Sequence, residues 1–325
     1  MAVITYREAL RQALIEEMER DPGVFVLGEE VGRYQGTFRV TEGLLQRFGE
    51  MRVVDTPISE SGIAGMAIGA AMIGLRPVAE FMTYSFALIA ADQIVNHAAK
   101  ILYMFGGQIA VPVVFRGPAG GGAQLSAQHS HSLESWYAHI PGLKVVTPAT
   151  PADAKGMLKT AIRDNNPVIF MEHAKLYSTR GEVPEGEYTV PFGVADVKRV
   201  GSDVTLIAYS QPVLLALHAA EKLAQSDGIE CEVIDLRSLQ PLDMDTVLRS
   251  IRKTHRAVVV HEDHRNVGFG AEVVARIQEL AFDDLDAPVL RVASADVPIP
   301  YARNLERAAF PSEDDIIRAV KRVLA

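Results

Sequence analysis

The stretch DTPISESGIAG, residues 55–65, joins an apolar run that ends at Val54 to a segment rich in glycine and alanine. The apolar run predicts a strand edge, Pro57 predicts a turn, and residues 61–74 predict a helix. Each glycine in such a helix costs about 1 kcal/mol relative to alanine. We therefore expect another surface to pack closely against this helix and to offset that cost.

Glu60 lies at this strand-to-helix junction, just before the small residues. Burial of a carboxylate at a closely packed corner raises its pKa, because the charged form loses its hydration. A carboxyl group of this kind is a candidate proton donor or acceptor. The alternative is that Glu60 caps the following helix, where the helix N-terminus favours its negative charge.

Short apolar strands alternate with helices along most of the chain, which is typical of a parallel sheet covered by helices on both faces. The predicted strands are 24–27, 78–81, 111–115, 143–146, 168–171, 204–209, 231–234, 257–260 and 289–292. The first predicted helix ends near Arg20, and the last one opens at Ser312. Between them, besides 61–74, the predicted helices span 40–48, 85–100, 151–163, 212–225, 244–253 and 270–282.

The alternation lapses in the polar stretch STRGEVPEGEYTVP, residues 178–191. We therefore predict an α/β protein with a first domain at 1–178, a linker at 179–191 and a second domain at 192–325. A chain of 325 residues is long enough for each domain to bury its own core.

The composition is that of a globular protein, with 48% hydrophobic residues and a net charge of −9. The negative charge argues against nucleic acid or an anionic membrane as the main partner, and no uninterrupted apolar run is long enough for a transmembrane helix. Because Cys231 is the single cysteine, a reducing compartment is expected. The N-terminus resembles neither a signal peptide nor a transit peptide, so the bacterial cytoplasm is favoured, with the mitochondrial matrix as the alternative after removal of a transit peptide.

Two glycine-rich segments suggest ligand sites without completing a known motif. The loop GPAGGGAQ, residues 117–124, could cradle a phosphate with its N–H groups, but it lacks the Lys-Ser/Thr ending of a P-loop. The tripeptide at 268–270, GFG, resembles the start of a dinucleotide fingerprint, but Val273 stands where the third glycine is expected.

Histidines gather in two further segments. His129, His131 and the nearby His139 could bind zinc, although a substrate-contacting or a structural loop histidine is favoured because no acidic or cysteine ligand lies close in sequence. The motif HEDH, residues 261–264, is similar to a metal site, but its place directly after an apolar run favours the polar exit of a strand.

Many blocks along the chain together resemble the β subunits of the thiamin-diphosphate-dependent 2-oxo acid dehydrogenases, most closely those of the pyruvate enzymes. The blocks are LGEEVG, DTPISESGIAG, GLRPVAEFMTYSF, DQIVNHAAK, FRGPAG, QHSHSLESWYAHIPGLKVVTPATPADAKG, AIRDNNPVIFMEH and ADVPIPYA. The resemblance covers essentially the whole chain. It implies a transketolase-like pyrimidine-binding domain followed by a transketolase C-terminal-like domain.

The resemblance also implies roles for individual residues. Glu60 matches the glutamate that hydrogen-bonds the aminopyrimidine ring of thiamin diphosphate, and Ile58 matches the residue packed beside that ring. Met82 and Phe86 match further cofactor-pocket positions. His129 matches the histidine that faces the substrate or the incoming lipoyl group.

By the same resemblance, five backbone carbonyls match a structural potassium site. They belong to Val113, Ala161, Ile162, Asp164 and Asn166. The local sequence alone does not reveal this site.

The chain lacks the GDG motif with which thiamin enzymes begin their magnesium and diphosphate site, and Asn165-Asn166 has no such motif upstream. The resemblance therefore implies an α subunit that holds most of the magnesium and diphosphate, in a heterotetramer of two α and two β subunits. It further implies that pyruvate is decarboxylated, and that the acetyl group passes to a lipoyl group of the acyltransferase core. The second domain would contact other subunits and that core.

Three alternatives remain open at this point. Branched-chain 2-oxo acids or acetoin could replace pyruvate, although Met82 and Phe86 resemble the pyruvate form. A self-sufficient transketolase-like enzyme is opposed by the missing GDG motif. A non-catalytic scaffold subunit is opposed by Glu60 and His129, because a scaffold needs neither.

Overall fold

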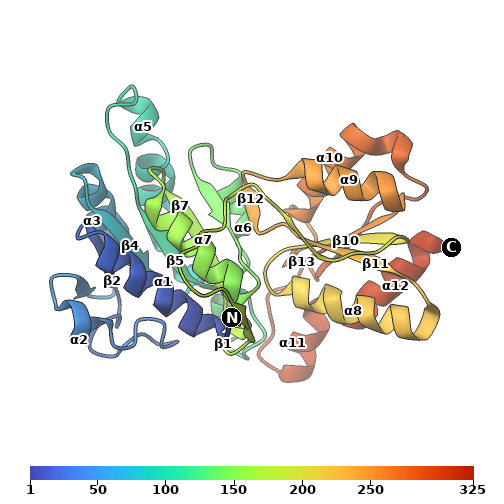
Figure 1. Ribbon diagram of the computed structural model, residues 1–325, viewed down its shortest axis with the longest axis horizontal. Helices are drawn as coiled ribbons and strands as arrows, with labels where there is room; N and C mark the ends of the chain where they lie inside the picture. The colour runs from blue at the N-terminus through green and yellow to red at the C-terminus, as the bar shows by residue number, and fades with distance from the viewer. The chain divides into compact units, whose positions relative to one another are not determined.

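The computed structural model describes all 325 residues, which form two compact units (Figure 1). The first unit comprises Met1–Ala119 and Trp136–Phe192, and the second comprises Gly120–Ser135 and Gly193–Ala325. The second unit thus includes a segment, 120–135, that the sequence-based division assigned to the first domain. It lies there because the backbone N–H groups of Gly121 and Gln124 donate to the carboxylates of Glu262 and Glu306, at 2.8 Å and 2.9 Å.

The first unit is built on a parallel sheet. Its strands are β2 (Val24–Gly28), β3 (Val53–Asp55), β4 (Arg76–Glu80), β5 (Val114–Ala119), β6 (Lys144–Val146) and β7 (Val168–His173), in the spatial order β6-β7-β5-β4-β2-β3. The register pairs Gly28 with both Asp55 and Glu80, so β2, β3 and β4 end at the same edge. This shared edge of carboxyl ends is where ligands bind in open parallel sheets.

Helices cover this sheet. They are α1 (Tyr6–Arg20), α2 (Leu44–Phe48), α3 (Glu60–Met72), α4 (Tyr84–Ala87), η1 (Leu88–Ala90), η2 (Gln93–Ala98), α5 (Ile101–Met104), α6 (Glu134–Ala138, which starts in the second unit), α7 (Pro151–Arg163) and η4 (Ala174–Leu176). The chain begins α1 with the expected capping box, in which Thr5 and Glu8 bond each other's backbone N–H groups.

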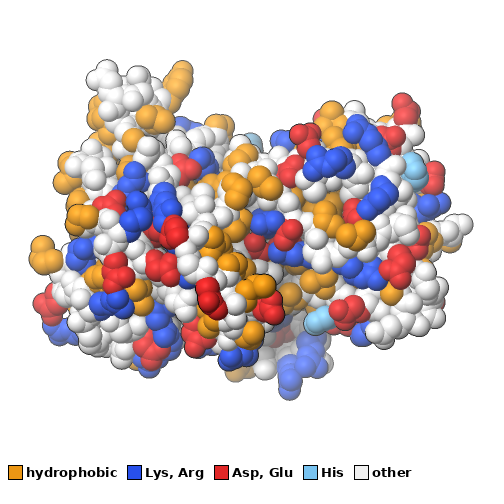
Figure 2. Space-filling view, viewed as in Figure 1, with side chains coloured by type: hydrophobic (Ala, Val, Ile, Leu, Met, Phe, Trp, Pro, Cys, Tyr) orange, Lys and Arg blue, Asp and Glu red, His pale blue; other side chains and the backbone are white.

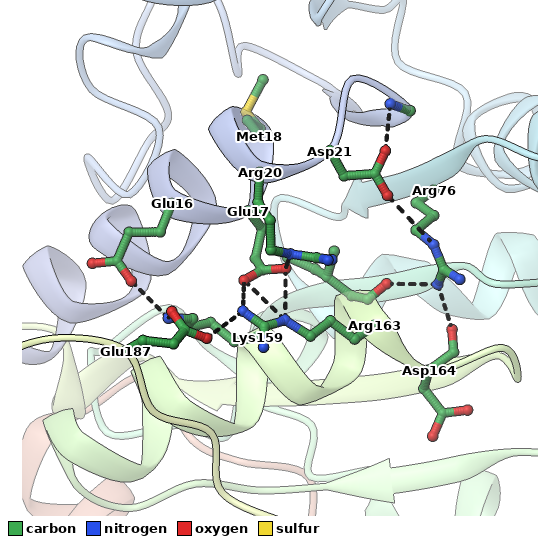
Figure 3. Close-up of polar contacts among 12 residues, drawn as sticks. Glu16, Glu17, Met18, Arg20, Asp21, Arg76, Lys159, Arg163, Asp164 and Glu187 are labelled. Carbon is green, nitrogen blue, oxygen red and sulfur yellow. Dashed lines mark hydrogen bonds and ion pairs between the residues drawn. The ribbon is translucent and has the colours of Figure 1, made fainter.

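Helix α1 lies along α7, and charged side chains cross between them (Figure 3). Glu17, which is fully buried, accepts two hydrogen bonds from the guanidinium of Arg163 at 2.5 Å and 3.0 Å. Lys159, also fully buried, donates to Glu16 at 2.8 Å and to Glu187 at 2.5 Å. Buried charges require partners of this kind, so the pairing fixes the helices in one register.

The second unit has a mostly parallel sheet of its own. Its order is β14 (Leu290–Ser294), β13 (Ala257–His264), β10 (Val204–Ala208), β11 (Cys231–Asp235) and β9 (Asp196–Arg199), with β9 antiparallel to β11. The other elements are η3 (Ala127–His129), α8 (Pro212–Asp227), β12 (Ser238–Gln240), α9 (Met244–Thr254), α10 (Gly270–Ala281), η5 (Phe282–Asp284), α11 (Arg303–Ala309) and α12 (Glu313–Leu324). The predicted fold class, two α/β domains with mostly parallel sheets, is confirmed.

Two predicted helices are wrong in extent. The helix predicted at 40–48 begins only at Leu44, because Gly43 adopts a left-handed conformation with φ of 81°. The helix predicted at 85–100 is broken into α4, η1 and η2. Within it, the N–H of Ala99 bonds the carbonyl of Ile94 at 3.0 Å, five residues back, which is the pattern of a π-helix.

The predicted linker at 179–191 contains a strand, β8 (Arg180–Val183), which pairs antiparallel with β1 (Ala2–Thr5). Strand β8, RGEV, lacks the apolar run that marks the buried strands, and β1, AVIT, is short and has no buried residue. No helix of the protein is long and apolar enough to cross a membrane. Acidic and basic side chains are interspersed over the face shown in Figure 2, as the mixed composition implies.

Candidate active site

Glu60 is the first residue of α3, and it follows the end of β3 after a short turn. The N-cap residue, Ser59, makes no capping bond with its side chain, so Glu60 supplies the negative charge of the first turn. Glu60 is half-buried rather than buried. The closely packed corner expected at this junction is therefore only partly closed in this chain.

A second carboxyl group, not predicted from the sequence, lies close to Glu60. Glu29 follows the end of β2, and burial together with the negative charge of Glu60 raises the pKa of Glu29. Both side chains come from the carboxyl ends of neighbouring parallel strands. The signal available in the sequence was the block LGEEVG, which places Glu29 directly after a strand.

The three residues assigned to the cofactor pocket lie around the same edge of the sheet. Ile58, in the turn before α3, is 74% exposed. Met82 follows the end of β4, Phe86 lies on α4, and both are half-buried. Apolar side chains together with the two carboxyl groups would suit a ring with both apolar and polar parts, and the assignment of these residues to a cofactor pocket stays a prediction.

An ion cluster lies at the carboxyl ends of β4, β5 and β7. Arg116 on β5 is 1% exposed and binds Glu80 on β4 and Glu172 on β7. The hydroxyl of Tyr177 donates to Glu172 at 2.7 Å. One guanidinium thus serves two carboxylates, and the cluster fixes the strand ends from which Met82 continues.

The pKa values reflect this balance. Burial raises the pKa of Glu80 despite the opposing charge of Arg116. Burial alone would lower the pKa of Arg116, but Glu172 and Glu80 raise it well above its ordinary value. Burial and the charge of Glu172 also raise the pKa of Tyr177. The guanidinium therefore stays charged, and the raised pKa of Glu80 favours uptake of a proton by that carboxyl group.

The five carbonyls of the predicted potassium site do not all point to one place. Those of Ile162 and Asp164 both accept hydrogen bonds from Nη1 of Arg76, at 2.9 Å and 3.0 Å (Figure 3). The carbonyl of Val113 accepts from the N–H of Val168 at 2.9 Å, and that of Ala161 accepts from the N–H of Asp164 at 3.3 Å. Carbonyl oxygens keep a second lone pair, and the turn after α7 gathers oxygens around a positive charge. Two of the five carbonyls thus already bind a cation of the chain itself, the guanidinium of Arg76, and the potassium site stays a prediction.

His129 lies in the second unit, at the end of η3, and its side chain is exposed. The backbone before it is strained, because Gln124 and Ser126 have φ of 57° and 69°. Burial lowers the pKa of His131, and the positive charges of His264 and His129 lower it further.

The hypothesis that the loop 117–124 cradles a phosphate gains no support from the segment 120–135. Its N–H groups already serve protein acceptors, since Gly121 and Gln124 donate to carboxylates and Gly120 donates to the carbonyl of His131 at 2.9 Å. At the end of the segment, burial and the charge of Asp263 raise the pKa of Glu134 well above its ordinary value. The glycines thus let carboxylates, rather than a ligand, approach the backbone.

The glycines at 268–270 make room for a histidine, a packing role that needs no dinucleotide. A Cβ added at Gly270 would lie 2.4 Å from the ring of His261, and one added at Gly268 would lie 2.8 Å from it. The motif HEDH lies within β13 rather than after it. No three His, Cys, Asp or Glu side chains are placed to hold a metal ion, so neither histidine segment forms a zinc site.

Comparison with known proteins gives the class of the protein. The transketolase pyrimidine-binding domain matches residues 2–179, and the transketolase C-terminal domain matches residues 193–316. A solved structure described as a split-gene transketolase, an inactive β4 tetramer, superposes with a TM-score of 0.81 at 25% identity, covering 99% of this chain and 98% of that one. The protein is thus transketolase-like in both of its units.

Curated relatives define the family more closely. The pyruvate dehydrogenase E1 component subunit beta of Rickettsia felis is 54% identical over 98% of this chain and 98% of its own length. The same subunit of Rhizobium meliloti is 53% identical over 99% of this chain and 70% of its own length, and the mitochondrial subunit of Bos taurus is 50% identical over 99% and 90%. The chain belongs to the family of pyruvate dehydrogenase E1 β subunits.

Proposed function

We propose that the chain is the β subunit of a pyruvate dehydrogenase whose active site is completed by an α subunit. The observation that carries the proposal is the half-open wall at the strand ends, where Glu60 lies beside Ile58, Met82 and Phe86. The names of relatives 50–55% identical to this chain support the reaction. The heterotetramer of two α and two β subunits and the lipoyl acyltransferase core are parts of the same proposal.

The residues of the wall fit the pyrimidine end of thiamin diphosphate. Glu60 offers a carboxyl group to a ring nitrogen, and the apolar side chains of Ile58, Met82 and Phe86 suit the faces of the ring. When bound, the cofactor supplies the carbon nucleophile and accepts the electrons left by decarboxylation. The chain gathers no three acidic or histidine side chains for a metal ion, so magnesium and the diphosphate are assigned to the α subunit.

Glu60 is assigned the movement of one proton. Its carboxyl group holds the proton near the pyrimidine and exchanges it with the ring nitrogen. Glu29, whose pKa is raised by burial and by the charge of Glu60, keeps the local negative charge low by taking up a proton readily. Cover by a partner subunit would exclude water and strengthen both effects.

Exposed apolar side chains support such a partner. On and beside α3, Met66 and Ile73 are 50% and 80% exposed, and Ile89 in η1 is 59% exposed. On α5, Tyr103 and Met104 are 88% and 72% exposed. Large exposed apolar side chains on helical segments that contact one another in series, as α3, η1, η2 and α5 do, are typical of a surface that another subunit covers.

His129 is proposed to face the substrate or the lipoyl group during acyl transfer. Its exposed side chain lies on a strained segment that carboxylates anchor, so the ring has a defined position without being buried. His129→Ala is expected to slow acetyl transfer to a lipoyl domain more than it slows decarboxylation measured with an artificial electron acceptor.

The experiment that tests the proposal measures carbon dioxide release from pyruvate with thiamin diphosphate and magnesium. It is run on this chain alone and after mixing with a candidate α chain. Activity only in the mixture supports the shared active site, whereas equal activity of the chain alone contradicts it. Comparison of pyruvate with a branched-chain 2-oxo acid and acetoin tests the substrate, and equal or faster turnover of either alternative would overturn pyruvate.

Glu60→Gln keeps the shape of the side chain and removes its proton exchange. We expect a loss of at least about 100-fold in turnover, with normal assembly by size-exclusion chromatography. Glu50→Gln is the matched control, because Glu50 is exposed and pairs only with Arg33 at the surface. Full activity of the Glu60 variant would contradict the role assigned to Glu60.

Potassium is proposed to bind the carbonyls around the turn after α7. Its test does not need activity: the melting temperature of the chain is compared in potassium chloride and sodium chloride of equal ionic strength. A higher value in potassium is expected, since a bound ion stabilises the folded state by mass action. Equal melting temperatures would count against the site.

A further inference from the structure

The second unit contains a pocket of about 550 Å³ at the edge of its sheet. Its walls are the edge strand β14, the loop after that strand, the end of α11 and one face of α12. The volume falls in the range of about 300–1,000 Å³ that is typical of small-molecule sites. The family roles assigned above make no use of this pocket.

Four arginines line the pocket: Arg265, Arg291, Arg318 and Arg322. Only Arg318 has a carboxylate partner, Asp315, three residues before it on α12. Arg265, Arg291 and Arg322 form no ion pair with any carboxylate of the chain. Three unpaired guanidinium groups around one pocket give it a strongly positive potential.

Two of these arginines are held close together despite their like charges. Nη1 of Arg291 donates to the carbonyl of Arg265 at 2.6 Å, and the N–H of Arg265 donates to the carbonyl of Ser294 at 3.1 Å. Arg291 is half-buried. Its guanidinium is therefore preorganised by the backbone, and its remaining N–H groups are available to a ligand.

The two acidic residues of the pocket offset this charge only in part, because Asp315 pairs with Arg318 and only Asp296 remains against three guanidinium groups. Asp315 caps α12 by accepting from Ser312, and it also pairs with Arg318. Asp296 accepts from the N–H of Asn266 at 2.9 Å. The four arginines and two aspartates leave two positive charges in excess. Arg265, Arg291 and Arg322, which form no ion pair, carry this excess.

A buried histidine responds to the same positive field. His261, on β13 beside the pocket's edge strand, is fully buried. Burial and the positive charges of Arg291 and Arg265 lower its pKa to about 4. The ring is therefore neutral at pH 7. Because neither arginine is paired with a carboxylate, their positive field extends to the neighbouring strand.

We propose that this pocket binds a small phosphorylated metabolite, with the phosphate held by Arg265, Arg291 and Arg322. Guanidinium groups bind phosphate through paired hydrogen bonds, which makes arginine the favoured residue for such sites. Part of the wall is apolar, with Leu290, Val292 and Phe310 among its side chains. It suits an organic body attached to the phosphate, so the ligand is a phosphate ester rather than inorganic phosphate alone.

The test is isothermal titration calorimetry on the full chain, repeated on its complex with the α subunit. The probes are inorganic phosphate, ribose 5-phosphate and AMP, with adenosine as the uncharged control. We expect saturable binding of at least one phosphate ester below about 10 mM, tighter than that of inorganic phosphate, and no binding of adenosine. Saturable binding of inorganic phosphate alone, or of adenosine as tightly as AMP, would contradict the proposal.

Arg291→Gln is expected to weaken the binding by about tenfold or more. Arg322→Gln changes an exposed residue of α12 and is also expected to weaken the binding. This variant tests the site even if the Arg291 variant is unstable. The matched control is Arg276→Gln, on α10, where the arginine already pairs with Glu272. No saturable binding by the wild type, or equal weakening by the control, would overturn the site. Neither outcome bears on decarboxylation, so this proposal fails or stands independently of the active site.

Discussion

Arg116 donates to Glu172 through both Nε and Nη2, each at 2.5 Å and each to a different carboxylate oxygen. The two residues lie on the neighbouring strands β5 and β7, near their carboxyl ends. Paired hydrogen bonds of this kind fix the guanidinium plane, and the same group also binds Glu80. The strand ends next to the candidate active site are thus held together by one guanidinium group between two carboxylates.

Arg116→Met should destabilise the first unit by about 3–5 kcal/mol, because it leaves two buried carboxylates without a partner. Carboxyl groups whose pKa is raised in the folded state stabilise that state as the pH falls. The difference in melting temperature between wild type and variant should therefore narrow from about pH 8 to pH 5. Arg276→Met, which removes an exposed ion pair on α10, is the control and should cost less than about 1 kcal/mol. A constant difference across this pH range would contradict the account.

Glu134→Gln should make the second unit less sensitive to pH. Burial and the charge of Asp263 raise the pKa of Glu134 in the folded state, so its contribution to stability is present at low pH and is lost as the pH rises through that raised pKa. The neutral amide has no such dependence. Hydrogen exchange of the segment 120–135, measured on both proteins at acidic and alkaline pH, should show faster opening of the wild type at alkaline pH. Glu279→Gln, a surface change on α10, should leave the exchange unchanged.

Glu17→Gln should loosen the contact between α1 and α7. The hydrogen bonds of Glu17 are the main cause of the raised pKa of Arg163, which shows how strongly the pair is coupled. Loss of a charged hydrogen-bond acceptor in a buried place costs about 1–3 kcal/mol. Denaturant titration should give this value for Glu17→Gln and less than about 1 kcal/mol for Glu19→Gln, whose exposed side chain pairs with Arg47. Equal costs would mean that burial does not set the strength of the pair.

Cys231 should resist thiol reagents in the native protein. The side chain is fully buried on β11, and burial raises the pKa of its thiol to about 12. The thiolate is the reactive form, so little of it is present at pH 8. Labelling with a coloured disulfide reagent should proceed only after denaturant is added, and rapid labelling of the folded chain would show that β11 opens easily.

The buried strands were predictable because continuous apolar runs mark strands that helices cover on both faces. Runs such as Val168–Met171 and Val204–Ala208 lie where they were expected. The pair β1 and β8 was missed, since its residues are largely exposed and their pairing is set by contacts distant in sequence. The break in the helix predicted at 85–100 was also hidden, because a π-helix changes the hydrogen-bond register without a proline or other breaker in the sequence.

Glu60 was predictable from its place between a strand and a helix of small residues, but its burial was not. Its carboxyl group is only half-buried in this chain, so reasoning from one sequence overestimates how closed the corner is. Arg116 was overlooked for the opposite reason. It lies among apolar residues of β5, and only the folded sheet brings Glu80 and Glu172 to its sides.

The segment 120–135 makes the second unit discontinuous in sequence. A shortened chain that starts at Gly193 would lack the partners of Glu262 and Glu306, and it would leave these buried carboxylates without their backbone donors. Conversely, a fragment that ends at Phe192 would carry a loop with nothing to hold its strained residues. A single cut in the chain therefore cannot separate the two units. During synthesis, a chain that has reached only Phe192 still lacks the residues that shape the loop bearing His129.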